Sequence, residues 1–146
     1  MTRTLSASGH DLGKPDPDWL AQRIRDLTPE QRQVLLQQGT ERPFCGGYLD
    51  NKDSGYYLCR LCELPLFDAA DKFDSGTGWP SFCRPIDSEH VHELTDHSHG
   101  MTRVEIRCAR CDGHLGHVFN DGPAPGGMRY CLNSASLQFQ QAAEKR

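Results

Sequence analysis

The sequence predicts a mostly β protein built from antiparallel sheets, with two short helices before them. The chain has 146 residues, which is the length of one domain. After Gly39, short runs rich in Tyr, Phe, Val and Ile are broken by Gly, Pro, Asp and Asn, a pattern typical of strands and turns. No long helical pattern follows Gly39, which disfavours a parallel sheet with interleaved helices.

The single domain, 1–146, divides into three parts. Residues 1–14 mix Ser, Thr, Gly and charged side chains without periodicity, and we expect them to form a mobile tail. Residues 15–39 hold two short helices with apolar side chains at helical spacing. The second helix should begin at Thr28, because Gln31 follows this N-cap residue three positions later, as in a capping box. Residues 40–146 form the β domain.

Alternation and turn residues locate the strands of the β domain. We expect strands at 55–59, 64–68, 81–85, 90–95, 101–107, 114–119, 129–132 and 135–139. Turns are expected at 121–122 and 125–127, where Asp-Gly and Pro-Gly-Gly interrupt the pattern.

Charge and hydropathy exclude several classes of function. Sixteen Lys and Arg against twenty Asp and Glu give a net charge of -4, whereas a nucleic-acid binder needs a positive surface. No apolar run approaches the roughly 18 residues that cross a bilayer. Residues 1–10 lack the hydrophobic stretch of a secretory signal. We therefore expect a cytoplasmic protein that binds neither nucleic acid nor membrane.

Four of the seven cysteines form two pairs with the same spacing. Cys59 and Cys62 make one C-x-x-C pair, and Cys108 and Cys111 make the other. Such turns aim both sulfurs at one tetrahedral ion, and four thiolates leave no position open to water. We therefore expect one structural zinc ion, with iron as the main competitor. The alternatives are two redox pairs, or buried cysteines that act as small hydrophobic residues.

Cys131 has the surroundings of a nucleophile. It lies in an expected strand, where side chains two positions apart share a face, so Arg129 and Asn133 should point the same way. A guanidinium beside a thiol favours the thiolate, which is the reactive form. The alternative is a structural cysteine in the core.

His114 and His117 are candidates for acid or base chemistry near neutral pH. Residues three apart face opposite sides of a regular strand, but Gly113 and Gly116 permit a bend that brings both rings to one pocket. The alternative is one ring in the core and one in solvent. A second metal site is disfavoured because no carboxylate stands at an obvious spacing. The histidines between residues 90 and 99 are expected to lie on a solvated strand and turn.

Longer motifs accompany these residues and identify a family. They are Glu41-Arg42-Pro43-Phe44, the two C-x-x-C pairs, Phe73-Asp74-Ser75-Gly76-Thr77-Gly78-Trp79-Pro80-Ser81-Phe82, Gly113-His114-Leu115-Gly116-His117-Val118-Phe119 and Arg129-Tyr130-Cys131-Leu132-Asn133-Ser134. From residue 41 to residue 139 the chain resembles the B-type methionine sulfoxide reductases, which reduce the R epimer of methionine sulfoxide. The resemblance implies antiparallel sheets around a catalytic depression, with a distant zinc held by four thiolates.

The resemblance also implies roles for the candidate residues. Cys131 corresponds to the catalytic cysteine, with His117 as the main proton donor and His114 as its helper. Arg129 and Asn133 stand around the same sulfur. A sulfoxide is a poor electrophile until its oxygen is protonated, so a thiolate and an acid must meet across it.

Two aromatic residues complete the implied site. Trp79 corresponds to the side chain that receives the S-methyl group, and Phe119 lines the same pocket. Attack leaves a sulfenic acid on Cys131, which a second thiol converts to a disulfide that thioredoxin reduces. The expected substrates are free, peptide-bound or protein-bound methionine-R-sulfoxide, and the protein is expected to act as a monomer.

The chain departs from the family at the resolving cysteine. The family often has this cysteine between the two glycines of the Trp-Pro motif, where this sequence has Thr77. Cys45 and Cys83 are the remaining candidates. Cys45 is preferred because two glycines follow it, whereas Cys83 falls in an expected packed strand. A third option is attack on the sulfenic acid by an external thiol.

Two other functions compete with the reductase hypothesis. A zinc-stabilised binding module, as in proteins that chaperone nucleotide-free GTPases, needs the four zinc thiolates but not Cys131, His117 and Trp79 together. A zinc-ribbon nucleic-acid binder needs a basic face, which the net charge of -4 disfavours.

Overall fold

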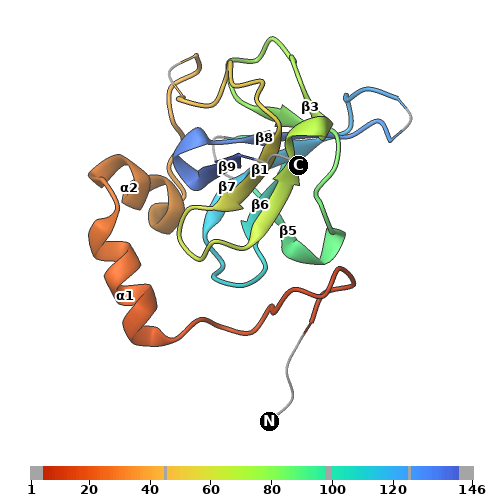
Figure 1. Ribbon diagram of the computed structural model, residues 1–146. Coiled ribbons are helices and arrows are strands. Elements are labelled where there is room, and N and C mark those ends of the chain that lie inside the picture. The colour runs from red at the N-terminus through yellow and green to blue at the C-terminus, as the bar shows by residue number, and fades with distance from the viewer. Residues whose placement is uncertain (1–4, 45, 98–99, 125, 142–146) are drawn as a thin grey trace.

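The computed structural model describes residues 5–44, 46–97, 100–124 and 126–141. Two helices, α1 (Pro17–Asp26) and α2 (Pro29–Gln37), precede all the strands and lie to one side of the sheets (Figure 1). The strands are β1 (Gly55–Cys59), β2 (Pro65–Asp68), β3 (Lys72–Phe73), β4 (Ser81–Phe82), β5 (Val91–Asp96), β6 (Arg103–Cys108), β7 (His114–Phe119), β8 (Arg129–Leu132) and β9 (Leu137–Gln141). No helix in the described ranges is long and apolar enough to span a membrane.

The strands form two antiparallel sheets, so the predicted fold class is confirmed. One sheet has the order β2-β1-β9, and the other has the order β3-β4-β8-β7-β6-β5. The core between them is aromatic: the Phe67 and Phe82 rings stack with centroids 4.6 Å apart, and Tyr57 packs on Phe82 at 5.1 Å. All three side chains have no exposed surface, and burial of this kind is the main force that holds the sheets together.

The helices follow from their capping residues. Thr28 and Gln31 make both hydrogen bonds of the expected capping box at the start of α2. Val34 and Leu35 of α2 are buried, while α1 buries no residue completely. After α2 the chain turns at Gln38, whose φ of 55° is left-handed, and the Gln38 amide donates to both oxygens of Glu105.

Most expected strands appear within two residues of their predicted bounds. The two shortest strands, β3 and β4, differ from the prediction. The 81–85 strand reaches only Phe82, since Pro85 cannot donate to a ladder and Cys83 donates its N–H to the carbonyl of Asp71 instead. The two-residue strand β3 was not predicted, because a pattern of two residues carries no periodicity.

Residues 5–14, which were expected to belong to a mobile tail, contact the domain. The hydroxyl of Ser8 donates to Asp87 at 2.9 Å, and Ser6 lies 2.8 Å from the Nε2 atom of His90. His90 was expected on a solvated strand but has no exposed surface, because this N-terminal segment covers it. In Figure 1 the segment, drawn in red, runs from α1 beneath the sheets.

Candidate active site and metal centre

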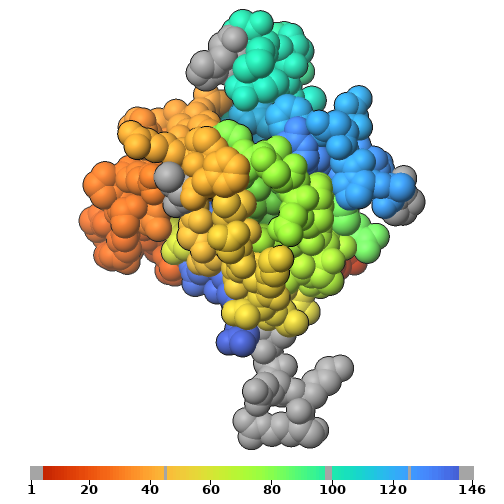
Figure 2. Space-filling model, turned by 90° about the horizontal axis from the view of Figure 1, so that it is seen from above, coloured from red at the N-terminus to blue at the C-terminus, as the bar shows by residue number. Residues whose placement is uncertain are grey.

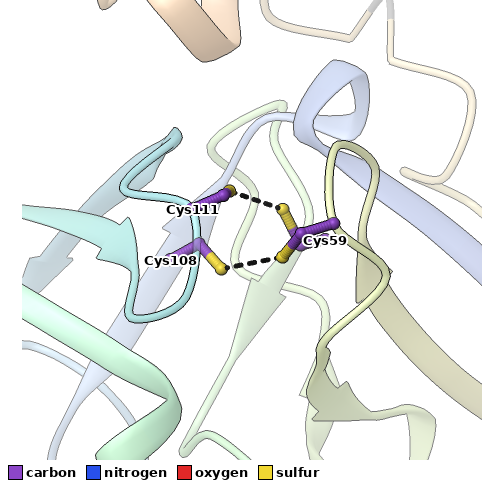
Figure 3. Close-up of side chains that lie close together, drawn as sticks. Cys59, Cys108 and Cys111 are labelled. Carbon is purple, nitrogen blue, oxygen red and sulfur yellow. Dashed lines mark hydrogen bonds between the residues drawn. The ribbon is translucent and has the colours of Figure 1, made fainter. Parts of the chain in front are cut away.

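Two turns bring the four paired cysteines together. Cys59 and Cys62 belong to the turn between β1 and β2, and Cys108 and Cys111 to the turn between β6 and β7. Their sulfur atoms all lie within 4.8 Å of one another. The Sγ atoms of Cys59 and Cys111 are 3.5 Å apart, and those of Cys62 and Cys108 are 3.4 Å apart (Figure 3). The cluster therefore joins the smaller sheet to the larger one.

The two turns have the same backbone geometry. In each, the residue after the second cysteine is left-handed, with φ of 66° at Glu63 and 65° at Asp112. The N–H of each of these residues donates to the carbonyl of the first cysteine, Cys59 or Cys108, at 2.8 Å. The equal geometry aims both sulfurs of each turn at one point.

The cluster fits a tetrahedral metal ion. Ideal Zn–S bonds of about 2.3 Å place the sulfurs of a tetrahedron about 3.8 Å apart, close to the observed separations. Hydrogen bonding with Cys108 lowers the pKa of the Cys62 thiol and raises the pKa of Cys59. Three of these cysteines are buried and Cys111 is half-buried, so the four sulfurs cannot all ionise without a cation beside them, because each added charge opposes the next. A divalent ion held by all four would have no open position for water, so its role would be structural.

Six of the predicted site residues line a cavity of about 240 Å³ beside the larger sheet. They are Trp79, His117, Phe119, Arg129, Cys131 and Asn133. Thr40, Thr77 and Arg103 also contribute to the lining. Residues from five separate parts of the sequence thus meet at one place.

Cys131 occupies the middle of this arrangement. In the ladders of the larger sheet it pairs with Ser81 of β4 on one side and with His117 of β7 on the other. Its sulfur lies 4.0 Å from the hydroxyl oxygen of Thr77. Because central strands are rigid, the sulfur is held in place by the sheet rather than by a loop.

Burial raises the pKa of the Cys131 thiol, although Thr77 and Arg129 act in the opposite direction. Arg129 was expected to favour the thiolate, and its charge does so. However, its guanidinium donates to both carboxylate oxygens of Asp121, at 2.8 and 3.1 Å, and it lies 4.3 Å from the Phe119 ring. The charge of Arg129 therefore lowers the pKa of Cys131 by less than desolvation of the sulfur raises it.

A β-bulge places the two predicted histidines on the same face. Ile106 pairs with Gly116 and Arg107 pairs with His114, so Leu115 is an extra residue in β7. The imidazole centroids of His114 and His117 lie 5.5 Å apart. The predicted bend is thus present in the form of a bulge.

Each histidine has a carboxylate partner. His117 Nε2 lies 2.7 Å from Asp96 Oδ2, and His114 Nδ1 lies 2.6 Å from Glu105 Oε2. Only His117 lines the cavity, whereas His114 is buried behind it. Burial lowers the pKa of His114 despite the hydrogen bond with Glu105, so His114 favours its neutral form.

Sequence reasoning missed both carboxylates, because neither stands at an obvious spacing from the histidines. Glu105 stands directly across the β6–β7 ladder from His117, and Asp96 ends the next strand, β5. The register of the three strands was the only signal that could have found them, and the bulge obscures that register.

Trp79 and Asn133 share an anchor that was also missed. The indole N–H of Trp79 donates to the Glu41 carbonyl at 3.0 Å, and the Glu41 N–H donates to Asn133 Oδ1 at 3.0 Å. The buried carboxylate of Glu41 accepts the N–H of Ala135 at 2.9 Å. Asn133 also donates its amide to the Leu115 carbonyl at 3.2 Å. The backbone of Glu41 therefore holds both Trp79 and Asn133, which lie in the cavity lining.

The two candidates for the resolving cysteine differ in what the structure shows. Cys45 lies outside the described residues. Cys83 follows β4, and its thiol lies 3.8 Å from Asp71 Oδ1 rather than in the lining of the cavity.

Comparison with known proteins assigns the family. Residues 27–141 match the SelR domain. A peptide methionine sulfoxide reductase MsrB of Caulobacter vibrioides is 56% identical over 139 residues, which cover 95% of this chain and 87% of the relative. Proteins with the same name from Saccharophagus degradans and Leptospira interrogans are 53% and 51% identical, over 90% of this chain and 96% and 98% of the relatives. The chain therefore belongs to the SelR-domain family of MsrB-type peptide methionine sulfoxide reductases, which are oxidoreductases.

Proposed function

We propose that this protein reduces the R epimer of methionine sulfoxide, with Cys131 as the nucleophile and His117 as the proton donor. Membership of the family supports methionine sulfoxide reduction in general. The observation that carries the finer proposal is the direct pairing of Cys131 with His117 across β7 and β8, inside a cavity that Trp79 also lines. A nucleophile and an acid on the same face of adjacent strands match the two demands of a sulfoxide.

The reaction balances without an external acid. The Cys131 sulfur forms a transient bond to the sulfoxide sulfur while His117 protonates the oxygen. The oxygen then passes to Cys131 as the S–O bond of the substrate and the transient S–S bond both break. Methionine leaves and Cys131 becomes a sulfenic acid. Because burial keeps the thiol mostly protonated at neutral pH, the proton that Cys131 gives up can replace the one that His117 donates. Thr77 and Arg129 stabilise the thiolate as it forms.

The aromatic walls select the epimer. Trp79 and Phe119 offer apolar surface to the S-methyl end, which leaves the oxygen to the polar side with His117. The opposite epimer with its methyl group in the same place would direct its oxygen away from the acid. Asn133 and Glu41 act on this selection indirectly, since they hold Trp79 in place.

Recycling requires a second thiol. In our proposal Cys45 attacks the sulfenic acid, water leaves, and thioredoxin reduces the resulting disulfide by thiol exchange. Cys83 is less suited, because its thiol faces Asp71 and the strand before it, β4, is paired on both sides. Thr77, at 4.0 Å from the Cys131 sulfur, stands where the family often has its resolving cysteine.

The metal centre is proposed to hold one structural zinc ion. Cys59, Cys62, Cys108 and Cys111 would bind it, and it would link the β1–β2 turn to the β6–β7 turn. The sequence distance between the pairs makes this link a long-range one, so it restricts the unfolded chain strongly.

Turnover of separated epimers of N-acetyl methionine sulfoxide amide tests the proposal, with thioredoxin, its reductase and NADPH as the coupled readout. We expect reduction of the R epimer only, and none by Cys131→Ser, which should remain folded. Equal rates on both epimers, or equal activity in the variant, would overturn it. Peptide mapping after one equivalent of substrate identifies the resolving thiol: a Cys83–Cys131 bridge would contradict our choice of Cys45.

A further inference from the structure

A second cavity, of about 350 Å³, adjoins the catalytic one. Trp79 lines both cavities, so the two share this residue as part of their walls. The second cavity has apolar walls that include Phe44 and Phe73, and it has two carboxylates in its lining, those of Asp50 and Asp74. None of its described lining residues is a lysine or arginine.

The charged side chains that line the two cavities have opposite signs. The catalytic cavity is lined by Arg103 and Arg129, whereas the second is lined by Asp50 and Asp74. In the space-filling view, the orange-to-yellow segment that follows α2 lies directly against the green segment that precedes β4 (Figure 2). The second cavity is formed by residues of these two segments.

Phe44 is held at the surface by its backbone. Its side chain is 68% exposed, and its φ of 66° is left-handed, which is rare for a bulky residue. The Phe44 N–H donates to the Gly78 carbonyl at 2.7 Å. A Cβ atom on Gly78 would lie 2.9 Å from the Phe44 ring, so glycine is needed for the ring to pack there. A strained and exposed aromatic side chain that is fixed in this way is typical of a binding surface.

The carboxylates are available to a ligand. Asp74 pairs with Lys52 at 3.4 Å, but both side chains are more than 70% exposed, and such surface pairs contribute little. The ammonium group of Lys72 donates to the backbone carbonyls of Leu49 and Asn51, so its charge acts on Asp50 and Asp74 without a hydrogen bond to either. An incoming cation can therefore take the place of Lys52 beside Asp74.

We propose that the second cavity is a subsite for a lysine or arginine side chain next to methionine sulfoxide in a polypeptide substrate. The aliphatic part of such a side chain would pack on Phe44 and Phe73 while its charged end reaches the carboxylates. Adjacent Cα atoms in a chain are about 3.8 Å apart, so the residue next to a methionine sulfoxide bound in the catalytic cavity can extend a long side chain past Trp79 into the second cavity. The inference rests on the proposed function and specifies its substrate class.

Short peptides with one flanking residue varied test the subsite. We would compare Arg, Ala and Glu before and after the methionine-R-sulfoxide, in acetylated and amidated peptides. We expect kcat/KM to be about tenfold higher with Arg than with Ala at one of the two positions, and lowest with Glu. Phe44→Ala and the double variant Asp50→Asn, Asp74→Asn should each reduce the Arg-to-Ala ratio to below about three.

The control variant is Asp53→Asn, which removes an exposed carboxylate of the same loop that does not line the cavity. It should keep the full Arg-to-Ala ratio. An Arg-to-Ala ratio near one at both positions in the unmodified protein would overturn the proposal, as would a ratio that all variants retain.

The preference for Arg over Ala can also be measured in binding, without turnover. Dissociation constants of the Arg and Ala peptides for Cys131→Ser should differ by the same factor of about ten. Failure to reduce N-acetyl methionine sulfoxide amide would refute the proposed function alone, and the ratio of dissociation constants would still decide on the subsite.

Discussion

His117 faces Cys131 directly across the ladder of β7 and β8, and both side chains line the same cavity. Residues paired in this way on neighbouring antiparallel strands have Cβ atoms about 5 Å apart. The separation suits a sulfoxide group placed between a sulfur and an imidazole. The pairing depends on the backbone ladder, so it does not require a loop to close.

Replacement of His117 by Asn should lower kcat about 100-fold, because the sulfoxide oxygen loses its proton donor. Asp96→Asn should have a smaller effect in the same direction, since Asp96 orients the ring through its 2.7 Å contact and does not itself protonate the substrate. Single-turnover release of methionine measures both. His92→Asn, on the exposed side of β5, is the control and should retain full activity. An unchanged rate in His117→Asn would exclude this histidine as the acid.

Alkylation of Cys131 should be slow at pH 7 and should rise with pH beyond 8.5, because burial raises the pKa of its thiol. Arg129→Met should raise that pKa further, since it removes the cation that favours the thiolate. Iodoacetamide labelling in a Cys45→Ser, Cys83→Ser background, followed by mass spectrometry, gives the rates. Arg25→Met, on exposed α1 surface, should not change them. A rate that levels off below pH 8 would contradict the raised pKa.

Thr77→Cys should create a new resolving thiol. The Thr77 oxygen is 4.0 Å from the Cys131 sulfur, so a cysteine at this position needs only a small shift to form a disulfide. In a Cys45→Ser background, thioredoxin-coupled turnover should recover at least tenfold on addition of Thr77→Cys. Ser75→Cys, two residues away, provides the comparison. The idea fails if mapping finds no 77–131 bridge after one turnover.

Removal of the metal should destabilise the whole domain. Cys59→Ser deletes one of four ligands in the cluster that joins the two sheets, and we expect the free energy of unfolding to fall by several kcal/mol. Elemental analysis of the unmodified protein should give one equivalent of zinc, and chelator should lower the melting temperature. Cys83→Ser, which lies outside the cluster, should change neither the zinc content nor the free energy of unfolding. Less than half an equivalent of any metal would refute the assignment.

Acid should destabilise the protein partly through His114. Burial lowers the pKa of His114 in the folded state, so the unfolded chain binds a proton that the folded chain does not. The free energy of unfolding therefore falls as pH drops below about 6.5, by up to about 1.4 kcal/mol per pH unit, until the folded-state pKa is reached. Urea denaturation at pH 7.5 and 5.5 should show a smaller pH dependence in His114→Asn. An equal loss of unfolding free energy between pH 7.5 and pH 5.5 in both proteins would show that His114 does not contribute to the pH dependence.

Local patterns predicted the local elements of this fold. The capping box of α2 and the bounds of β1, β7 and β8 follow from neighbouring residues alone. The repeated C-x-x-C spacing likewise indicated the sulfur cluster, because each turn is a local structure. The motifs also contain the six predicted residues that line the 240 Å³ cavity.

Long-range properties were not accessible in the same way. The partners Asp96 and Glu105 depend on strand register, and the extra residue Leu115 changes that register. The raised pKa of Cys131 depends on how much of the protein covers it, which no neighbouring residue reveals. His90 is buried for the same reason, since the segment that covers it lies about 80 residues earlier.

The attachment of two cavity walls to Glu41 has a consequence for the order of events. Glu41 holds Trp79 through its carbonyl and Asn133 through its N–H, and only three residues separate it from Cys45 in the chain. Travel of that thiol toward Cys131 would pull on both hydrogen bonds. Because methionine leaves before this disulfide forms, the methyl pocket would loosen only once it is empty, and it would be rebuilt for the next substrate when thioredoxin reduces the disulfide.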